Sequence, residues 1–470
     1  MNIGSEMQEI SSNNKRIAKN TLLLYFRMLV TMAVSLYTSR VVLNILGVED
    51  FGIYNVVGGI VAMFGFINGS MTSATQRYLT FELGQNNRAQ LTKVFSTSLS
   101  IHGIISFLII VLAETVGLWF LWNKMQIPAD RMNAAFWVFQ CSVAASVIMI
   151  MSVPYNAAII AHERMSAFAY ISIIEVSLKL LIVCFLRYFH TDKLILYAVL
   201  IVIVQFLIRL CYSWYCNRHF NETKYRWSWD KGLFKEMTGF ASWNMFGSLA
   251  AITFTQGLNL LLNMFFGPVV NAARGIAVQA QTAIGQFSSN FQTALNPQIT
   301  KSYATGDMEY MHGLIFRSAK FSFFLLLLLS LPVLIETKAI LTLWLKIVPD
   351  HTVVFLRIML CTTWVYAVSN PLITAASATG KIKLYQSVVG GLLLLILPIS
   401  YLCLRFGLPA YSVFIVHLVI EITAQFARLL MLKRMIKLSL REYFSKVVWC
   451  IFKVTAIALA VPLAVAYWQP

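Results

Sequence analysis

The sequence predicts an all-α polytopic membrane protein with two homologous six-helix lobes around a central cavity and one extra C-terminal span. Three observations predict this class: a strongly apolar composition, apolar stretches that recur along the whole chain, and an internal repeat. Of the 470 residues, 59% are hydrophobic and only 12% are charged, whereas a soluble domain has roughly 25% charged residues. Each apolar stretch approaches the roughly 20 residues that a helix needs to cross a bilayer, where the backbone must satisfy its own hydrogen bonds.

The internal repeat divides the chain into two halves. Residues 43–87 align without a gap with residues 263–307, which lie 220 positions later, and Gly47 aligns with Gly267. A second, shorter match at an offset of 217 supports the first. In both copies a helix ends in a glycine turn, and a long helix with small and polar residues along one side follows. Paired halves of this kind are common in transporters, which handle their substrate at the interface between the halves.

Thirteen spans are expected, each an apolar stretch that ends at charged or turn-forming residues. They cover residues 20–46, 51–80, 94–121, 133–160, 165–187, 193–216, 238–266, 269–300, 314–345, 353–379, 384–405, 408–432 and 446–467. The expected domains are an N-terminal lobe (1–217), a cytoplasmic connection (218–236), a C-terminal lobe (237–435) and an additional span (436–470). Six spans precede the connection, and an even number gives both lobes the same orientation in the membrane. The thirteenth span has no partner in the first half.

Lysine and arginine residues collect in the connections on one side of the predicted membrane. That side includes Lys15, Lys224 and Lys437, whereas only a few basic residues, such as Lys124 and Arg131, fall on the other side. Because basic connections tend to stay in the cytoplasm, the N-terminus is expected to be cytoplasmic. The formal net charge of +18 then reflects topology and an affinity for anionic membrane lipids, and it requires no nucleic-acid partner.

The seven cysteines lie within or beside apolar spans, and no two of them form a CxxC pair. They are interpreted as packing residues. Neither a disulfide framework nor a metal site is therefore expected.

Three segments of the first half carry a family resemblance. The run LGVEDFGIY at 46–54, followed by NGSMTSATQRY at 68–78 and PYNAAIIAHER at 154–164, resembles the polysaccharide-biosynthesis (O-antigen-type) flippases of bacteria. These are oligosaccharide-lipid exporters of the multidrug/oligosaccharidyl-lipid/polysaccharide (MOP) superfamily, and the likeness covers most of the chain. The resemblance implies a MATE-like fold of 12 or 14 helices in two six-helix lobes, from which an odd thirteen departs. It also implies a location in the bacterial inner membrane.

The resemblance implies a function as well. Such a protein translocates an undecaprenyl-diphosphate-linked oligosaccharide by alternating access, for the assembly of O-antigen (lipopolysaccharide) or capsule. Its expected partners are this lipid-linked oligosaccharide, membrane lipids and other polysaccharide-assembly proteins. On this interpretation the protein is a transporter and no enzyme.

Arg27 is a candidate for binding the diphosphate of such a substrate. At about 100° per residue it shares one face of the first span with Asn20, Thr31, Ser35 and Thr38. A charge inside an apolar span is costly, so two interpretations are open: Arg27 lines a water-filled cavity, or it extends to the lipid headgroups. The shared polar face favours the cavity.

A polar stripe follows one face of the eighth span, and the repeat supplies a second stripe. The eighth span carries Arg274, Gln281, Ser288, Gln292 and Asn296. Asn68, Thr72 and Gln76 stand at the repeat positions of the last three. Both stripes are predicted to line the substrate cavity, and the alternative is tight helix packing through small and amide side chains. Arg27 and Arg274 are expected to converge on the diphosphate, because a guanidinium stays charged and holds phosphate oxygens in a fork.

His417 and Glu421 form an ionisable pair one turn apart in the twelfth span. They are either a coupling site for an H⁺ or Na⁺ gradient or a satisfied structural pair. Glu175 and Lys179, one turn apart in the fifth span, are expected to neutralise each other. No other cofactor is expected.

Two further functions compete with the flippase. A cation-coupled multidrug exporter of the same superfamily would favour a carboxylate in the first span, but that span offers Arg27 and no acidic residue. A membrane enzyme of polysaccharide assembly, such as a polymerase or an acyltransferase, would need a large external loop or a catalytic constellation. The longest external connections are about ten residues, and no Ser/His/Asp grouping stands out. The flippase is favoured.

Overall fold

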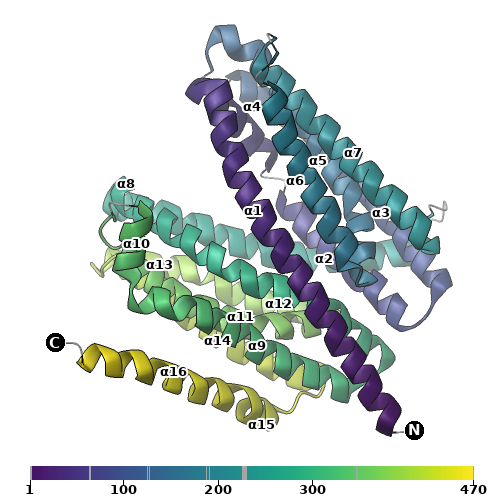
Figure 1. Cartoon of the computed structure of the whole chain (residues 1–470), viewed down its shortest axis with the longest axis vertical. Coiled ribbons are helices and arrows are strands. Elements are labelled where there is room, and N and C mark those ends of the chain that lie inside the picture. The colour runs from purple at the N-terminus through teal and green to yellow at the C-terminus, as the bar shows by residue number, and fades with distance from the viewer. Residues whose placement is uncertain are drawn as a thin grey trace. The chain divides into compact units, whose positions relative to one another are not determined.

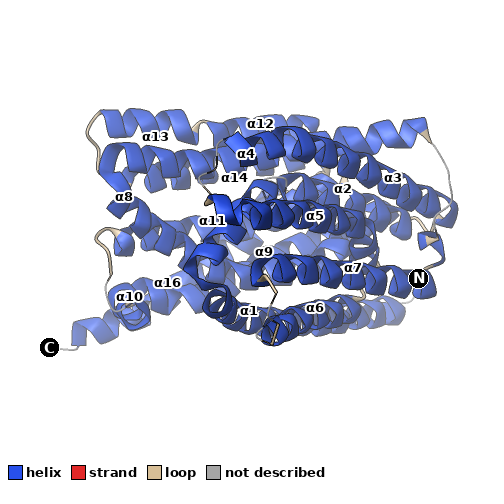
Figure 2. Cartoon of the chain, turned by 90° about the horizontal axis from the view of Figure 1, so that it is seen from above, coloured by secondary structure: helices blue, strands red, loops and turns tan. Residues whose placement is uncertain are grey.

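The computed structural model describes residues 3–62, 65–123, 125, 127–186, 188–189, 191–224, 230–345 and 348–468. Nearly all of these residues are helical, and none of them is in a strand. Figure 2 shows helices joined by short loops. The expectation of an all-helical protein is confirmed.

The contacts divide the chain into an N-terminal unit, residues 1–241, and a C-terminal unit, residues 242–470. The first turns of α8 (Lys231–Thr305) fall within the N-terminal unit. There the Tyr78 hydroxyl donates to Glu236 Oε1 at 3.1 Å, and the Tyr78 ring lies 5.7 Å from that of Phe240. The aromatic part of the expected connection, residues 225–229, lies outside the described residues.

The N-terminal unit is organised around α5, which packs against α1, α2, α3 and α7. Its helices before α8 are α1 (Ile3–Ala62), α2 (Gly65–Gly84), α3 (Arg88–Leu112), η1 (Ala113–Gly117), α4 (Leu118–Asn123), η2 (Ala129–Arg131), α5 (Met132–Ala161), α6 (Met165–Leu186), α7 (Lys193–His219) and η3 (Asn221–Thr223). The first half of α1 runs beside α6 (Figure 1), so residues on that side of α1 are buried within the unit.

In the C-terminal unit α11 and α14 pack against each other, with α9 on α11 and with α12 and α13 on α14. After α8 the helices are α9 (Met308–Ile335), α10 (Thr337–Leu345), α11 (Thr352–Ala378), α12 (Lys383–Leu394), α13 (Ile396–Arg405), α14 (Ser412–Met435), α15 (Leu440–Tyr443), η4 (Phe444–Val448) and α16 (Trp449–Trp468). The last three form the additional span, which packs against α9.

The two repeat copies share their backbone breaks. Gly47 within α1 has φ 80°, and Gly267 within α8 has φ 79°, a left-handed conformation that glycine adopts without a steric penalty. At both positions the helix resumes directly after the glycine, so the four-residue connection expected at 47–50 is replaced by a single non-helical residue. At each break the helix changes direction, and its two limbs are joined without a loop.

The caps that follow the repeat also match. Asn87 Oδ1 accepts from the backbone N–H of Gln90 at 3.2 Å, at the start of α3. Asp307 Oδ1 accepts from the N–H of Tyr310 at 3.0 Å, at the start of α9. A capping side chain satisfies one of the free N–H groups of a helix N-terminus, which explains why both polar turns end in Asn or Asp.

Eleven helices of the described chain are long and apolar enough to cross a membrane. The expected count of thirteen differs because the segments 51–80 and 269–300 are not in that set, although their described residues are helical. The first segment includes residues 63 and 64, which lie outside the described residues, whereas amide and hydroxyl side chains lower the mean hydropathy of 269–300. These two segments are the ones that carry the predicted polar stripes.

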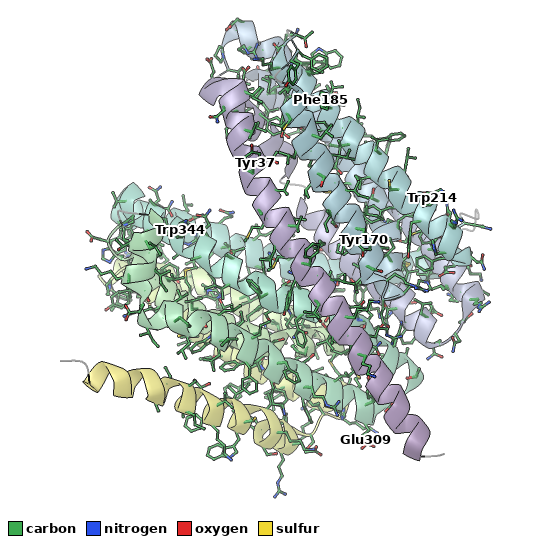
Figure 3. All side chains as sticks on the ribbon, viewed as in Figure 1. Tyr37, Tyr170, Phe185, Trp214, Glu309 and Trp344 are labelled. Carbon is green, nitrogen blue, oxygen red and sulfur yellow. The ribbon has the colours of Figure 1, made fainter. Side chains whose placement is uncertain are left out.

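Large aromatic side chains cover the outside of the helices, as Figure 3 shows for Tyr170 and Phe185 on α6 and Trp214 on α7. Their exposed fractions are 60%, 54% and 63%. Apolar exposure on this scale is costly in water but favourable in lipid. The protein is a multi-pass membrane protein.

Candidate functional site

Arg27 lies inside the N-terminal unit, against α6. Its guanidinium carbon is 4.5 Å from the centre of the Phe168 ring, a cation–π contact. Glu175 and Tyr212 interact with it electrostatically, and its Nε is buried without a hydrogen-bond partner. Asn20, on the same predicted face, donates to the carbonyl oxygen of Glu163 at 3.2 Å. This face of α1 therefore meets α6 and the turn before it, while the Arg27 side chain keeps partial exposure.

The other predicted residues of this unit lie on α2. Thr72 Oγ1 donates to the carbonyl oxygen of Asn68 at 2.7 Å, and Asn68 Oδ1 is buried without a partner. Asn68, Thr72 and Gln76 are each partly exposed along one side of the helix. Glu175 and Lys179 form the expected ion pair on α6, with 2.6 Å between Nζ and Oε1.

Arg274 is held by the limb of α8 that precedes the Gly267 break. Its Nη2 donates to the carbonyl oxygen of Thr255 at 2.8 Å, and its Nη1 donates to Asn259 Oδ1. The side chain is only 5% exposed, and its Nε has no partner. Arg274 therefore joins the two limbs of the helix, and it carries a charge that the neutral groups Thr255 and Asn259 solvate but do not cancel.

A cavity of about 360 Å³ lies within the C-terminal unit, and we call it the C-terminal cavity. Of the predicted site residues, its lining includes Gln281, Ser288, His417 and Glu421. Arg274, Gln292 and Asn296 are not among its lining residues. The complete lining is Ala251, Phe254, Gln281, Thr282, Gly285, Gln286, Ser288, Ser289, Leu326, Thr362, Thr363, Tyr366, Ala367, Asn370, Leu393, His417, Glu421 and Arg428. The structure thus brings two of the five residues of the eighth-span stripe together with His417 and Glu421 of α14.

Hydrogen bonds fix the stripe to the neighbouring helices. Gln281 Nε2 donates to Thr363 Oγ1 at 2.8 Å and to the Met359 carbonyl oxygen at 3.1 Å, both on α11. Gln292 donates to Ser322 of α9. Asn296 Oδ1 accepts from Thr374 Oγ1 at 2.9 Å. The amides of this stripe hold α8 against α9 and α11, as the packing alternative predicts.

Glu421 is paired with Arg428 and not with His417. Arg428 Nη1 lies 2.7 Å from Glu421 Oε1, and the exposed side-chain fractions of the two residues are 3% and 5%. His417 instead packs against Phe254, with 4.8 Å between the ring centres. A buried ion pair of this kind is costly to break, because either partner alone would leave an uncompensated charge.

A hydrogen-bond chain continues from Arg428 to the additional span. Arg428 Nη1 also donates to Ser369 Oγ at 3.0 Å, and Ser369 Oγ donates to Gln425 Oε1 at 2.6 Å. Gln425 Nε2 then donates to the Tyr443 hydroxyl at 3.3 Å. The fully buried Tyr443 belongs to α15, so the span without a repeat partner contributes to the polar network beside the C-terminal cavity.

Ion pairs also flank α5 of the N-terminal unit, outside its membrane-spanning part. At one end Arg131 contacts Asp50 at 2.5 Å and Asp192 at 2.7 Å. Burial is the largest single effect and raises the pKa of Asp192, but the hydrogen bonds and charge of Arg131, together with the backbone N–H groups of Ile195 and Leu194, hold that pKa below its usual value. At the other end His162 Nε2 lies 2.5 Å from Glu222 Oε1.

Glu222 shows the same balance of effects. Burial is the largest single effect and raises the pKa of its carboxyl group, but the hydrogen bond with His162, a backbone hydrogen bond and the charges of His162 and Arg88 together hold that pKa below its usual value. The His162 ring is stacked on Phe220, with 4.0 Å between the ring centres. Both ends of α5 are thus fixed by charged contacts.

Sequence reasoning missed three residues of the C-terminal network: Ser369, Gln425 and Tyr443. The sequence does place Arg428 on a face similar to that of Glu421, because seven residues are close to two helical turns, but this spacing does not identify Arg428 as the partner. For Ser369, Gln425 and Tyr443 the sequence carries no such signal, since they are brought together by packing between α11, α14 and α15.

Comparison with known proteins places this geometry in a family. A profile described as "Polysaccharide biosynthesis protein" matches residues 17–303. No curated protein matches the sequence significantly.

Several solved structures share the fold. An outward-facing multidrug resistance MATE family transporter of the MOP superfamily has a TM-score of 0.78 at 12% identity, covering 90% of this chain and 96% of that chain. A MOP superfamily transporter from Pyrococcus furiosus gives 0.77 at 13% identity, with coverages of 90% and 96%. A Vibrio cholerae MATE transporter in the bent form gives 0.76 at 16% identity, with coverages of 93% and 99%. These likenesses show that the chain has the fold of the MATE transporters, and because the family profile spans more than half of the 470 residues, the chain belongs to the polysaccharide biosynthesis protein family.

Proposed function

We propose that this protein is a flippase that moves an undecaprenyl-diphosphate-linked oligosaccharide across the bacterial inner membrane, for the assembly of O-antigen or capsule. Family membership supports the link to polysaccharide assembly, and the MATE-type fold supports transport over catalysis. The observation that carries the proposal is the polar, charged interior of an apolar helical protein, which the C-terminal cavity exemplifies. A bulky hydrophilic glycan with an anionic headgroup needs such an interior to cross lipid.

The proposed mechanism is alternating access between two lobes. Arg27 and Arg274 hold the diphosphate, because neither forms an ion pair with a carboxylate among the described residues and both keep an unsatisfied Nε–H. Gln281 and Ser288 contribute polar groups to the glycan path, together with Asn68, Thr72 and Gln76. The lipid tail stays in the bilayer.

Gradient coupling is a separate part of the proposal. We infer that an H⁺ or Na⁺ gradient acts at His417 and Glu421, which face the C-terminal cavity. Replacing Glu421 with Gln should then lower transport driven by an imposed gradient. An undiminished rate would remove this residue from the coupling step.

A cation-coupled multidrug exporter is the second candidate function, because a structural neighbour is described as a multidrug resistance transporter. The carboxylate of Glu421 could serve a cationic drug only if the drug displaced Arg428, which lies 2.7 Å away. This competition disfavours the exporter. Drug susceptibility of cells with and without the protein separates the two candidates.

The proposal also covers location and partners. We propose that the N-terminus lies in the cytoplasm and that the partners are membrane lipids and polysaccharide-assembly proteins, and no nucleic acid. A cysteine that replaces Lys224 or Lys437 should not react with an impermeant maleimide in intact cells. A cysteine that replaces Lys124, which lies outside the described residues, should react. Strong labelling at position 224 would reverse the orientation.

The direct test of the flippase is export of glycan. A strain that lacks its own lipid-linked oligosaccharide flippase is complemented with the chain, and surface glycan is measured beside drug resistance. We expect restored glycan and unchanged resistance. Resistance without glycan would show the multidrug exporter instead.

A further inference from the structure

We propose that Arg428 is an oxyanion-binding residue of the C-terminal cavity, and that an anion binds to it only when Glu421 takes up a proton. The inference rests on the proposed function, for which it names an additional phosphate site and its link to protons. It does not depend on Arg27 or Arg274. The chemical class of the ligand is a phosphate group, such as the diphosphate of a lipid-linked substrate.

The first observation is the position of the pair. Glu421 and Arg428 both line the C-terminal cavity, and both are nearly completely buried. A ligand that enters the cavity therefore meets the two charged groups side by side. Because they neutralise each other, the cavity attracts neither an anion nor a cation while the pair is intact.

The second observation is a shortage of acceptors around Arg428. Its Nη1 donates to Glu421 and Ser369, but its Nε–H is buried without a partner. The Tyr385 hydroxyl of α12 lies beside Arg428 as a weak hydrogen-bond partner, but the two groups do not meet the geometry of a full hydrogen bond. Buried donors that are not fully satisfied are costly, and one oxyanion with several oxygens can accept from both.

The proton follows from charge balance. If an anion replaces the carboxylate on Arg428, Glu421 is left as a buried, uncompensated charge next to that anion, which is strongly unfavourable. A proton on Glu421 removes this charge. The exchange is then Glu421⁻·Arg428⁺ plus the anion plus H⁺ to give neutral Glu421 and an Arg428⁺·anion pair, and the proton offsets one unit of the negative charge that the anion brings.

Given the other groups near Glu421, Arg428 is the cation that exchanges the Glu421 carboxylate for the anion. Glu421 also faces Tyr366 of α11, Tyr385 of α12 and His417 of its own helix. Further away, Arg274 of α8 interacts with His417 but is held by its own acceptors in α8.

The chain from Ser369 through Gln425 to Tyr443 keeps Arg428 in place during the exchange. Ser369 Oγ accepts from Arg428 Nη1, and the Tyr443 hydroxyl ends the chain in the additional span. The guanidinium can therefore change its acceptor without leaving its position. The additional span thus has a role that the internal repeat does not explain.

The experiment uses the full chain, purified in detergent, with sulfate as the probe. Sulfate is a tetrahedral oxyanion that does not titrate near neutral pH, so any proton taken up must come to the protein. Titration calorimetry in two buffers of different ionisation enthalpy counts the protons. We expect about one proton per bound sulfate, and an affinity that falls by up to about tenfold for each unit of rising pH over the range in which that proton is taken up.

Two variants isolate the pair. Glu421→Gln keeps the shape and leaves Arg428 free, so it should bind sulfate without proton uptake and without this pH dependence. The double variant Glu421→Gln/Arg428→Gln leaves no unpaired charge and should bind at least tenfold more weakly. Glu442→Gln is the matched control, because it removes the carboxylate of an ion pair on the surface, with Lys446 at 2.6 Å. It should retain both the affinity and the proton count.

A second set of ligands identifies the source of the phosphate. Undecaprenyl diphosphate and phosphatidylglycerol are each tested as competitors of sulfate, and the substrate diphosphate should compete more strongly than the bilayer lipid. Sulfate binding without proton uptake, proton uptake that persists in Glu421→Gln, or no sulfate binding would overturn the proposal. These results do not depend on glycan export, so a chain that shows the exchange but fails to restore glycan would contradict the flippase alone.

Discussion

The N-terminal and C-terminal units share backbone features but differ in how they hold their charged residues. Gly47 and Gly267 break corresponding helices at φ 80° and 79°, and Asn87 and Asp307 cap the helices that follow. In the N-terminal unit, however, Arg27 rests on an aromatic ring and keeps partial exposure. The repeat thus preserves the turns and caps that set the path of the chain.

In the C-terminal unit the charged residues are enclosed in specific polar contacts. Arg274 has two acceptors from its own helix, and Arg428 has a carboxylate and a hydroxyl. An arginine in an apolar span therefore has no fixed role. Its function depends on whether its partners are aromatic rings, neutral hydrogen-bond acceptors or a titratable carboxylate.

The largest difference between the units is expected when an ion pair is broken. Arg428→Ala leaves Glu421 buried and unpaired, and it should lower the free energy of unfolding by about 3–5 kcal/mol. Lys179→Ala in the N-terminal unit should cost about 1 kcal/mol or less, because both members of that pair are about a quarter exposed and Gln205 also donates to Glu175. Thermal or denaturant unfolding in detergent measures both.

The double variant Glu421→Gln/Arg428→Met is the control for this comparison. It removes both charges at similar volume and should be close to the parent in stability, since a buried pair is weak evidence for net stabilisation. If Arg428→Ala and Lys179→Ala lowered the free energy of unfolding equally, this would contradict the burial of the Glu421–Arg428 pair.

The two units can also be compared in transport, because each contributes one arginine, Arg27 or Arg274, to the proposed diphosphate site. Loss of one charge-assisted hydrogen bond, worth about 1.5–3 kcal/mol, should weaken diphosphate binding by roughly tenfold to a hundredfold in Arg27→Ala and Arg274→Ala. Lysine should rescue only in part, because it lacks the planar fork. Surface glycan in a complemented strain is the measurement, with the amount of protein in the membrane as its control.

The two positions should also differ. Arg274→Ala leaves Asn259 and the Thr255 carbonyl without their donor, so it should lower stability as well as export, whereas Arg27→Ala should affect export with little loss of stability. Normal expression and parental glycan export in both variants would show that these arginines are structural.

Much of the fold could be predicted from the sequence, because it depends on local signals. Composition predicted the membrane, and the repeat predicted a glycine turn at the same place in both halves. Of the two expected spans that are not among the candidate membrane helices, 51–80 contains residues outside the described chain, and 269–300 carries amides and hydroxyls that lower its hydropathy. A hydropathy pattern alone does not distinguish such a helix from a connection.

The side-chain partners could not be predicted to the same degree. His417 and Arg428 lie four and seven residues from Glu421, and both spacings fall on one helix face, so the sequence does not decide between them. The structure selects Arg428 at 2.7 Å. The acceptors of Arg274 lie across the Gly267 break, and their approach depends on how the two limbs of α8 pack. Partners of this kind are set by packing, which local patterns do not encode.

The glycine breaks should respond equally in the two units. Gly47→Ala and Gly267→Ala place a Cβ in the left-handed region and should each cost about 1–2 kcal/mol in the free energy of unfolding. Gly103→Ala within α3 is the matched control, because it is helical and a Cβ there meets no atom within 4 Å. That substitution should be neutral or stabilising by up to about 1 kcal/mol. A cost confined to one unit would contradict the equivalence of the breaks.

The smallest effect is expected from Glu222 and Asp192, the carboxylates that contact the two ends of α5 in the N-terminal unit. Glu222 and Asp192 both have pKa values held below their ordinary values of 4.5 and 3.8. A group whose pKa is lower in the folded state contributes stability that is complete above the ordinary pKa and is lost as the pH falls through the folded one. Acidification below about pH 4.5 should therefore destabilise the N-terminal unit.

Glu222→Gln and Asp192→Asn should each reduce this dependence of stability on pH by less than about 1 kcal/mol, because both side chains keep some exposure. Thermal unfolding of the parent and the two variants between neutral and acidic pH measures how stability changes with pH. At neutral pH each variant should be slightly less stable than the parent, and at the acidic end the difference should vanish. A difference that grows as the pH falls would show that these ion pairs do not stabilise the folded state.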